Sequence, residues 1–232
     1  VVVTGAGGGQ GRATAHLFAD EGANVAVTDL NQIDVDQVVQ EISDAGGSAK
    51  GWTMDVADSN RVTQVIDNAA DIFGGLDFLI NNAGILRDKS FSKMTLDDFD
   101  MVVNVHLMGA AYCAHAVWPV MKARNYGRIL MTTSPTGLYG NFGQTNYGAA
   151  KLGQVGLMHS LKIEGAKNNI HTNTIAPVAA TRMTEDLMPE AVLEKLGPEL
   201  VTPAAIFLVS EDAPNGVILQ AQGGKFSIAC IV

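Results

Sequence analysis

The chain has 232 residues, 47% hydrophobic and 17% charged, with a formal net charge of −9 at pH 7. This length suits one sizeable core, so we expect a single domain over residues 1–232. The acidic balance argues against nucleic acid or an anionic membrane as a partner, because both need basic patches. The apolar runs are strand-sized, shorter than the roughly 20 residues of a membrane-spanning helix. Cys113 and Cys230 lie far apart, which predicts no disulfide framework or metal site and favours a reducing compartment such as the cytoplasm.

Short β-branched apolar runs alternate with helix-length segments along the chain. Such alternation predicts βαβ units, with a parallel sheet covered by helices on both faces. The first run has no basic head or cleavage site, so we expect no secretory signal and a natural chain that starts further upstream. The seven predicted strands are Val1–Thr4, Asn24–Asp29, Ala49–Val56, Leu76–Asn82, Gly127–Thr133, Ile170–Ala176 and Val217–Gln220.

A glycine-rich loop, Thr4-Gly-Ala-Gly-Gly-Gly-Gln-Gly-Arg12, follows the first strand and precedes the predicted helix Ala13–Glu21. Glycine permits positive φ and close backbone approach, so the free amides at the helix start can hold a pyrophosphate. The glycines that fit this role are Gly5, Gly9 and Gly11, in a G-x-x-x-G-x-G spacing. Tight turning alone is the alternative explanation for the cluster.

The second predicted strand ends at Asp29, where a carboxylate can accept hydroxyls of an adenosine ribose and repel a 2′-phosphate. NAD is therefore expected in preference to NADP. Two observations leave this open: Asp29 could simply cap the next turn, and Arg12 could hold a phosphate.

Three later segments carry helix signals. Asp58 is a predicted N-cap for Ser59–Phe73, and Thr95 with Asp98 forms a predicted capping box for Leu96–Gly109. Pro119 is expected to interrupt or kink the helical stretch 110–123.

Tyr147 and Lys151 are four residues apart on a predicted helix, and Ser134 ends the preceding strand region. An i,i+4 spacing brings the two side chains onto one face, where the ammonium can lower the pKa of the phenol. A more acidic phenol can act as a proton-transfer catalyst. The pair alone is often a chance feature of an amphipathic helix, so the hypothesis depends on the other motifs.

The segment 177–198 contains three prolines around short helical pieces at 184–187 and 191–196, and it is a candidate lid over a substrate. An apolar wall for an acyl chain or a steroid could come from this region and the preceding one, although core packing explains the same residues equally well. The candidates are Leu138, Tyr139, Phe142, Met183 and Met188.

With Asn81-Asn82-Ala83-Gly84 after the fourth strand, the four motifs together resemble the short-chain dehydrogenase/reductase family over essentially the whole chain. The resemblance implies a single-domain, Rossmann-like, doubly wound α/β fold with a seven-stranded parallel sheet. It also implies a general acid/base at Tyr147, a carbonyl-binding hydroxyl at Ser134, a lysine at 151 that binds the nicotinamide ribose, and an asparagine at 104 that supports a water chain. The residues implied in cofactor binding are Gly5, Gly9, Gln10, Gly11, Asp29, Leu30, Asp55, Val56, Asn82, Ala83, Gly84, Tyr147, Lys151, Pro177, Val178 and Thr181.

Val178 departs from the family pattern, which has glycine after this proline, and its side chain is expected to narrow the space beside the nicotinamide. Three stretches, 82–91, 139–144 and 169–177, resemble more closely the (3R)-hydroxyacyl-CoA dehydrogenase group of multifunctional β-oxidation enzymes, which is similar to a 17β-hydroxysteroid dehydrogenase. The implied reaction is reversible hydride transfer between a secondary alcohol and NAD.

Several functional alternatives stay open at this stage. On the same scaffold, the chain could be a 3-oxoacyl-carrier-protein reductase or a sugar or cyclic-alcohol dehydrogenase. A catalytically silent NAD-binding regulator is a second possibility, although such proteins usually lack the tyrosine or the lysine. The small-residue helix face Gly148, Ala149, Gly153 and Gly156 resembles the helix through which family members form dimers and tetramers, so we expect a homo-oligomer.

Overall fold

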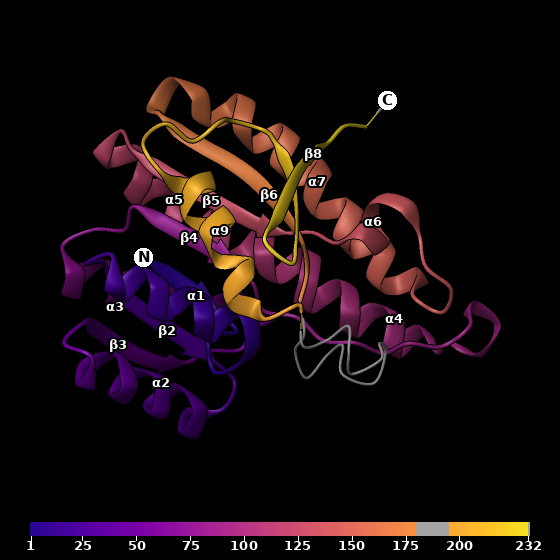
Figure 1. The fold of residues 1–232 in the computed structure, drawn as a ribbon, viewed down its shortest axis with the longest axis horizontal. Helices are drawn as coiled ribbons and strands as arrows, with labels where there is room; N and C mark the ends of the chain where they lie inside the picture. Colours follow the sequence, from indigo (N-terminus) through magenta and orange to yellow (C-terminus); the bar gives the residue numbers. More distant parts are fainter. Residues whose placement is uncertain (180–194, 232) are drawn as a thin grey trace.

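The computed structural model describes residues 1–179 and 195–231, and Figure 1 shows one sheet enclosed by helices. The sheet has eight strands in the order β3-β2-β1-β4-β5-β6-β7-β8, and the first seven run parallel. The predicted α/β fold is therefore confirmed. The strands are β1 (Val2–Thr4), β2 (Asn24–Asp29), β3 (Ser48–Thr53), β4 (Phe78–Asn81), β5 (Gly127–Thr132), β6 (Ile170–Val178), β7 (Ile218–Gln222) and β8 (Lys225–Ala229).

Helices cover both faces of the sheet because neighbouring residues of each central strand point to opposite sides. Val3, Ile80 and Leu130 pack towards α1 (Gly9–Asp20), α2 (Gln32–Asp44) and α9 (Thr202–Val209). Their neighbours Val2, Leu79 and Ile129 pack towards α3 (Ser59–Phe73), α5 (Gly109–Arg124) and α7 (Thr145–Gly165). The remaining helical elements are η1 (Phe91–Lys93), α4 (Leu96–Val103), η2 (Asn104–Met108), α6 (Pro135–Tyr139), η3 (Ala166–Asn168) and η4 (Pro198–Leu200).

An eighth strand, β8, corrects the predicted number of seven. It pairs antiparallel with β7, and Gln222 lies opposite Lys225 across a two-residue turn. Gly223 and Gly224 have φ of +52° and +74°, which suits the twist of a tight hairpin. The Gly-Gly pair is the sequence signal that predicts this hairpin.

The starts of the helices follow their capping chemistry. Asp58 accepts backbone N–H groups of residues 60 and 61, and Thr95 accepts the N–H of Asp98, so both predicted N-caps are confirmed. The first helix, α1, begins at Gly9 and not at Ala13, so the last glycines of the loop already belong to it.

Helices α4, η2 and α5 form one continuous stretch, Leu96–Arg124, which contains a π-helical segment at η2. Pro119 lies inside α5 without ending it, so the helix is not interrupted there, and a kink at this proline stays a prediction. The stretch is 29 residues long and apolar enough to span a membrane by length and composition, but core helices of folded proteins pass the same test. Its α5 part packs into the core against the sheet and α3.

Several predicted features lie outside the described residues. These are Thr181, Met183, Met188, the short helical piece 184–187 and most of the piece 191–196. The structure therefore does not test the predicted lid.

Candidate active site

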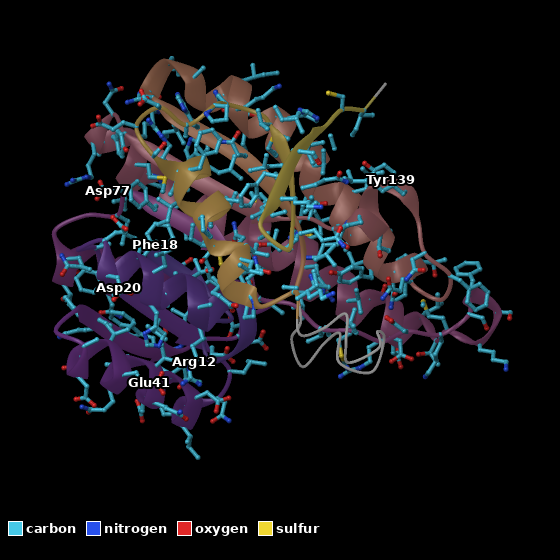
Figure 2. The ribbon with its side chains drawn as sticks, in the orientation of Figure 1. Arg12, Phe18, Asp20, Glu41, Asp77 and Tyr139 are labelled. Carbon is cyan, nitrogen blue, oxygen red and sulfur yellow. The ribbon has the colours of Figure 1, made fainter. Side chains whose placement is uncertain are left out.

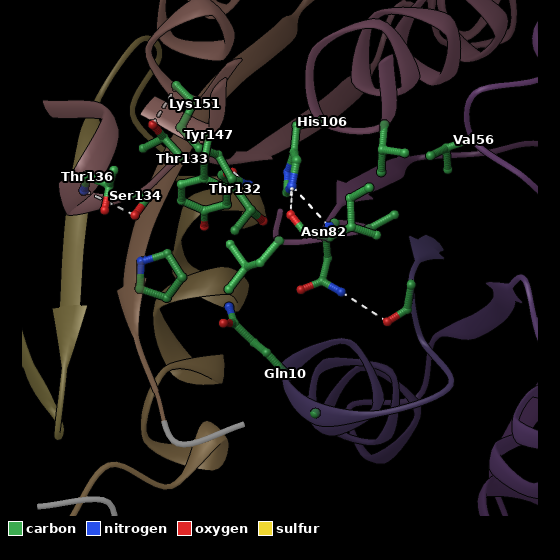
Figure 3. Close-up of a pocket in the computed structure, with 18 of the residues that line it drawn as sticks. Gln10, Val56, Asn82, His106, Thr132, Thr133, Ser134, Thr136, Tyr147 and Lys151 are labelled. Atoms are coloured by element: carbon green, nitrogen blue, oxygen red, sulfur yellow. Dashed lines mark hydrogen bonds between the residues drawn. The ribbon is translucent and has the colours of Figure 1, made fainter. Parts of the chain in front are cut away.

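A pocket of about 800 Å³ lies at the carboxyl ends of the strands. It opens where the strand order reverses between β1 and β4, the place where open α/β sheets bind ligands. All of the predicted site residues that the structure describes line this pocket, except Gly11 and Asn104. Figure 3 shows side chains from the first loop, the ends of β4 and β5, and α7 converging there.

The glycine loop forms a cradle that side chains would fill. Gly5 has φ of +64°, and a Cβ there would lie 2.8 Å from the backbone of Ala83. A Cβ at Gly11 would lie 2.1 Å from the carbonyl oxygen of Gly5, so Gly11 shapes the cradle from behind. Helix α1 starts at the cradle, and no side chain caps its N-terminus. Free amides at a helix start favour a phosphate, so this loop fits the pyrophosphate of a dinucleotide.

Asp29 stands at the end of β2 beside the cradle. Its Oδ2 accepts the N–H of Gly7 at 2.9 Å, and its Oδ1 accepts the N–H of Leu30 at 2.7 Å. These bonds fix the carboxylate at the rim of the pocket, where Asp29, Leu30 and Asp55 all line the wall. The negative charge is placed as a ribose-binding acid requires.

Arg12 is the cation nearest to this acid in sequence, and it is engaged elsewhere. Its guanidinium lies 2.5 Å from Oε1 of Glu41, and His16 lies 3.0 Å from the other oxygen of the same carboxylate. Figure 2 shows Arg12 and Glu41 facing each other between α1 and α2. The pKa of Glu41 is lowered by its partners Gln37, His16 and Arg12, against an opposing desolvation. The guanidinium is thus held by a carboxylate of its own protein.

Asn82 joins the two strand ends at the switch point. Its Nδ2 donates to the carbonyl oxygens of Thr4 and Gly5, each at 3.0 Å, and its backbone N–H bonds to the Thr4 hydroxyl. These bonds hold the segment 82–84 against the glycine loop. The wall of the pocket formed by residues 82–84 is therefore held in a fixed position relative to the glycine cradle.

Ser134, Tyr147 and Lys151 meet on the opposite wall, as Figure 3 shows. Ser134 ends the β5 region and is the N-cap of α6, while the other two side chains share one face of α7. The phenol is hydrogen-bonded to the Ser134 hydroxyl. Lys151 is only 2% exposed, and its Nζ donates to the carbonyl oxygen of Thr132 and lies 5.4 Å from the centre of the Tyr147 ring.

The acid–base properties of the pair differ from the sequence-based expectation. Burial raises the pKa of Tyr147, the Ser134 hydrogen bond lowers it, and the charge of Asp88 raises it further, with a net upward shift. The expected depression of the phenol pKa by the ammonium is thus absent from this arrangement. The physical reason is that Lys151 is itself desolvated, which lowers its pKa to about 7.

Asn104 does not reach the pocket. It is exposed, and its neighbour two residues on, His106, lines the pocket instead and is 1% exposed. The π-helical turn η2 accommodates one extra residue per turn, so helix periodicity alone gives the wrong register here. His106 was therefore not predicted as a site residue, because the run Val103-Asn-Val-His106 carries no periodic signal for it.

The proposed apolar wall is corrected for its three described members, Leu138, Tyr139 and Phe142. Tyr139 and Phe142 are exposed, and Leu138 packs on Val155, Met158 and Ile218. None of the three lines the pocket.

A polar cluster around Gln144 forms this side of the pocket. Gln144 is 6% exposed and donates to Asp88 at 2.7 Å. Its Oε1 accepts from the Thr136 hydroxyl at 2.9 Å and from Asn141. Val178, which stands where the family has glycine, lines the pocket beside Pro177.

Comparison with known proteins identifies relatives over the whole chain. The family described as short chain dehydrogenase matches residues 1–191. A short-chain type dehydrogenase/reductase of Mycobacterium tuberculosis is 48% identical, over 97% of this chain and 82% of its own length. The peroxisomal multifunctional enzyme type 2 of mouse is 48% identical over 97% of this chain, but the chain spans only 31% of that enzyme.

Two further similarities are informative. The 3-oxoacyl-[acyl-carrier-protein] reductase of Thermotoga maritima is 35% identical over 96% of each protein. A crystal structure of a short chain dehydrogenase from Mycobacterium avium superimposes with a TM-score of 0.91 at 37% identity, and the match covers all of this chain and 85% of that one.

Proposed function

We propose that this chain, which belongs to the short-chain dehydrogenase/reductase family, is an NAD-dependent dehydrogenase that interconverts a (3R)-3-hydroxyacyl thioester and its 3-oxo form. As an oxidoreductase of this family it acts on CH–OH groups. The observation that carries the proposal is that Ser134, Tyr147 and Lys151 line the same pocket as the glycine cradle and Asp29.

The residues present fit a nicotinamide dinucleotide. The glycine cradle and the uncapped start of α1 suit the pyrophosphate, Asp29 suits the adenosine ribose, and Asp55 and Val56, which line the same pocket, would hold the adenine. When bound, the nicotinamide supplies the acceptor or donor of the hydride.

The protein groups handle the proton and the oxygen. The Tyr147 phenol takes the alcohol proton in oxidation and returns it in reduction. The Ser134 hydroxyl, already hydrogen-bonded to the phenol, holds the substrate oxygen. The buried Lys151 supplies positive charge next to the phenol when it is protonated, and binding of a cofactor hydroxyl near Nζ would favour that form.

NAD is proposed in preference to NADP because the rim carries the fixed Asp29 carboxylate, while Arg12 is paired with Glu41. We expect a much higher kcat/KM with NAD. Replacing Asp29 by Ser and Glu41 by Ala removes the repulsion and frees the guanidinium, so the double variant should gain activity with NADP. The variant Asp44→Asn, at an exposed acid on the same helix, is the control and should keep the NAD preference. A wild type that prefers NADP would contradict this part of the proposal.

The acyl-thioester substrate is supported by the similarity to the multifunctional enzyme and to the 3-oxoacyl reductase. The second candidate function, reduction of a 3-oxoacyl group on a carrier protein, rests on the latter relative. Steady-state assays with (3R)- and (3S)-3-hydroxyacyl-CoA, a hydroxysteroid, a cyclic alcohol and a 3-oxoacyl carrier protein separate these candidates. Turnover of only the (3R) thioester would support the proposal, and turnover of only the carrier-bound substrate, with NADPH, would replace it.

We also propose that the protein forms homodimers or homotetramers. We expect it to work in a reducing compartment such as the cytoplasm. The exposed apolar side of α7 supports assembly, because an unpaired apolar stripe favours association. The two cysteines are free thiols, which is compatible with a reducing environment.

A further inference from the structure

The π-helical turn η2 brings His106 into the catalytic pocket. The side chain is 1% exposed and points between the Tyr147 ring and the segment after β4, as Figure 3 shows. Insertion of an extra residue into a helical turn carries an energetic cost, and such turns often lie at functional sites. We therefore expect this turn to have a chemical role.

The imidazole is hydrogen-bonded to the backbone of the segment that follows β4. Its Nε2 lies 2.8 Å from the carbonyl oxygen of Ile85 and 3.0 Å from the N–H of the same residue. A Cβ at Gly84 would lie 2.3 Å from Cε1 of the ring, so only glycine lets the chain pass this closely. The segment 84–86 thus packs closely against the histidine, and all three of its residues line the pocket.

The same ring contacts the catalytic tyrosine. The His106 and Tyr147 rings are perpendicular, with centroids 5.0 Å apart. Perpendicular packing is a favoured geometry for two aromatic rings, so this contact favours the observed orientation of the phenol ring. His106 therefore links the segment that follows β4 to the phenol.

The surroundings keep the imidazole uncharged. Burial lowers the pKa of His106 well below its usual value, and the charge of Lys151 lowers it further, while a hydrogen bond to the Ile85 carbonyl oxygen opposes both effects. The titratable groups that face the ring from α7 are Tyr147 and Lys151. Among the described residues that line the space behind the ring, including Gln154 and Asn81, none is charged. Nδ1 is buried and has no hydrogen-bond partner in the described part of the chain, so a second N–H would be left unsatisfied.

We propose that His106 is a positioning residue for the proton transfer: the neutral imidazole anchors Ile85 through Nε2 and holds the Tyr147 ring so that the phenol stays beside Ser134. Either neutral tautomer serves the anchor, because Nε2 donates to the Ile85 carbonyl in one and accepts the Ile85 N–H in the other. The role rests on the proposed dehydrogenase activity, since it concerns the proton transfer of that reaction.

Two substitutions separate the two contacts. His106→Phe keeps a ring against Tyr147 but loses the bond to Ile85, and His106→Gln keeps an amide that can reach Ile85. His115→Phe, at an exposed histidine of α5, is the matched control. Each variant is measured for kcat and KM across pH with the best alcohol substrate, for NAD affinity and for thermal stability.

The expected result is a selective loss in His106→Phe. Its kcat should fall about tenfold or more with little change in KM, because small misplacement of a reacting group is costly. The pH above which oxidation proceeds should also rise, because a hydrocarbon ring solvates the phenolate less than an imidazole does. His106→Gln should recover most of the rate and the wild-type pH profile. An unchanged kcat and pH profile in His106→Phe would overturn the proposal, and so would equal losses in both variants that track lower thermal stability.

A readout without turnover keeps this test separate from the proposed function. In ¹⁵N spectra of the imidazoles, the signal of His106 is the one that disappears in His106→Gln. Its chemical shift should remain that of a neutral imidazole over the whole acidic and neutral pH range in which the protein stays folded. An imidazole that titrates near the ordinary histidine pKa would overturn the proposal even if the substrate were unknown. An inactive wild type with a neutral His106 would count against the proposed function and leave the placement of the imidazole supported.

Discussion

At the scale of single residues, the site depends on how burial changes the proton affinity of Tyr147 and Lys151. Burial shifts the pKa of the phenol upward and that of the ammonium downward, so burial disfavours the charged form of each group. A catalytically useful phenolate then requires additional interactions in the loaded site. The hydrogen bond with Ser134 already favours the phenolate, because it lowers the pKa of Tyr147.

Replacing Tyr147 by Phe tests the proton-transfer role directly. The change removes only the hydroxyl, so NAD affinity should stay close to that of the wild type. Loss of a general acid/base should lower kcat by about 10²–10⁴-fold, measured as NADH formation from the alcohol. Tyr139→Phe, at an exposed tyrosine outside the pocket, should keep full activity. Turnover retained in the Tyr147 variant would refute the mechanism.

The buried Lys151 makes the stability of the cofactor-free protein pH-dependent. Its pKa falls from 10.5 to about 7 on folding, so between these values the unfolded chain binds a proton that the folded chain does not. Stability should therefore increase as pH rises through this window, and the cost of burial is full below about pH 7.

Replacing Lys151 by Met removes this group and isolates its contribution. From pH 7 to about pH 9, the free energy of unfolding should rise by about 2 kcal/mol more in the wild type than in Lys151→Met. Urea unfolding of both proteins at each pH measures the difference. Parallel curves for the two proteins would show that the folded-state pKa is not lowered.

Sequence reasoning at this scale succeeded where the spacing is regular. Tyr147 and Lys151 share a face because α7 is an uninterrupted α-helix, so the i,i+4 rule holds. The prediction that Asn104 belongs to the site was wrong because η2 is not α-helical. The extra residue in that turn moves His106 to the inward position. The pKa of Tyr147 was also misjudged, because the sequence alone does not reveal that Lys151 is almost completely buried.

At the scale of elements, the loop between β1 and α1 has no room for a Cβ atom at Gly11. A methyl group at Gly11 would overlap the carbonyl oxygen of Gly5, and both atoms are held by backbone. The loop must then move away from the phosphate position or the helix must shift. Sequence predicted the cradle correctly but placed the start of α1 four residues late, because glycines in a first turn do not look like helix formers.

Gly11→Ala is therefore expected to abolish NAD binding and to reduce stability by about 1–3 kcal/mol, as overpacking does. Gly22→Ala is a suitable control because its φ is +85° but no atom lies within 4 Å of the added Cβ. The control should lose stability from backbone strain and still bind NAD. Calorimetric titration with NAD and thermal melts of both variants measure the two effects. Normal binding by Gly11→Ala would contradict the proposed cradle.

At the scale of the whole molecule, α7 connects the catalytic site to the surface. One of its faces carries Tyr147 and Lys151 into the pocket, and the other leaves a stripe towards solvent. The α/β architecture and the position of the pocket could be predicted because alternating strands and helices allow few topologies. The packing of Gly153, by contrast, could not be predicted from the sequence: a Cβ there would lie 2.9 Å from the Leu107 side chain, so Gly153 packs on η2 within the same chain.

The exposed stripe on α7 consists of Ala149, Leu152, Gly156, Ser160 and Ile163, which follow one another at three- and four-residue spacings. Leu152 is 43% exposed and Ile163 is 73% exposed. Small residues beside such apolar side chains allow two helices to approach closely, so we expect this stripe to pair with its copy in a second chain. The wild type should then run as a dimer or tetramer in size-exclusion chromatography with light scattering.

The double variant Leu152→Glu with Ile163→Glu should shift the protein to a smaller species, because two carboxylates cannot be buried unpaired between helices. Ile33→Glu, at a 76% exposed position on α2, is the matched control and should leave the assembly unchanged. Because the stripe lies on the helix that carries Tyr147 and Lys151, dissociation should also loosen that helix and lower kcat more than it weakens NAD binding. An unchanged mass in the double variant, or an equal change in the control, would place the interface elsewhere.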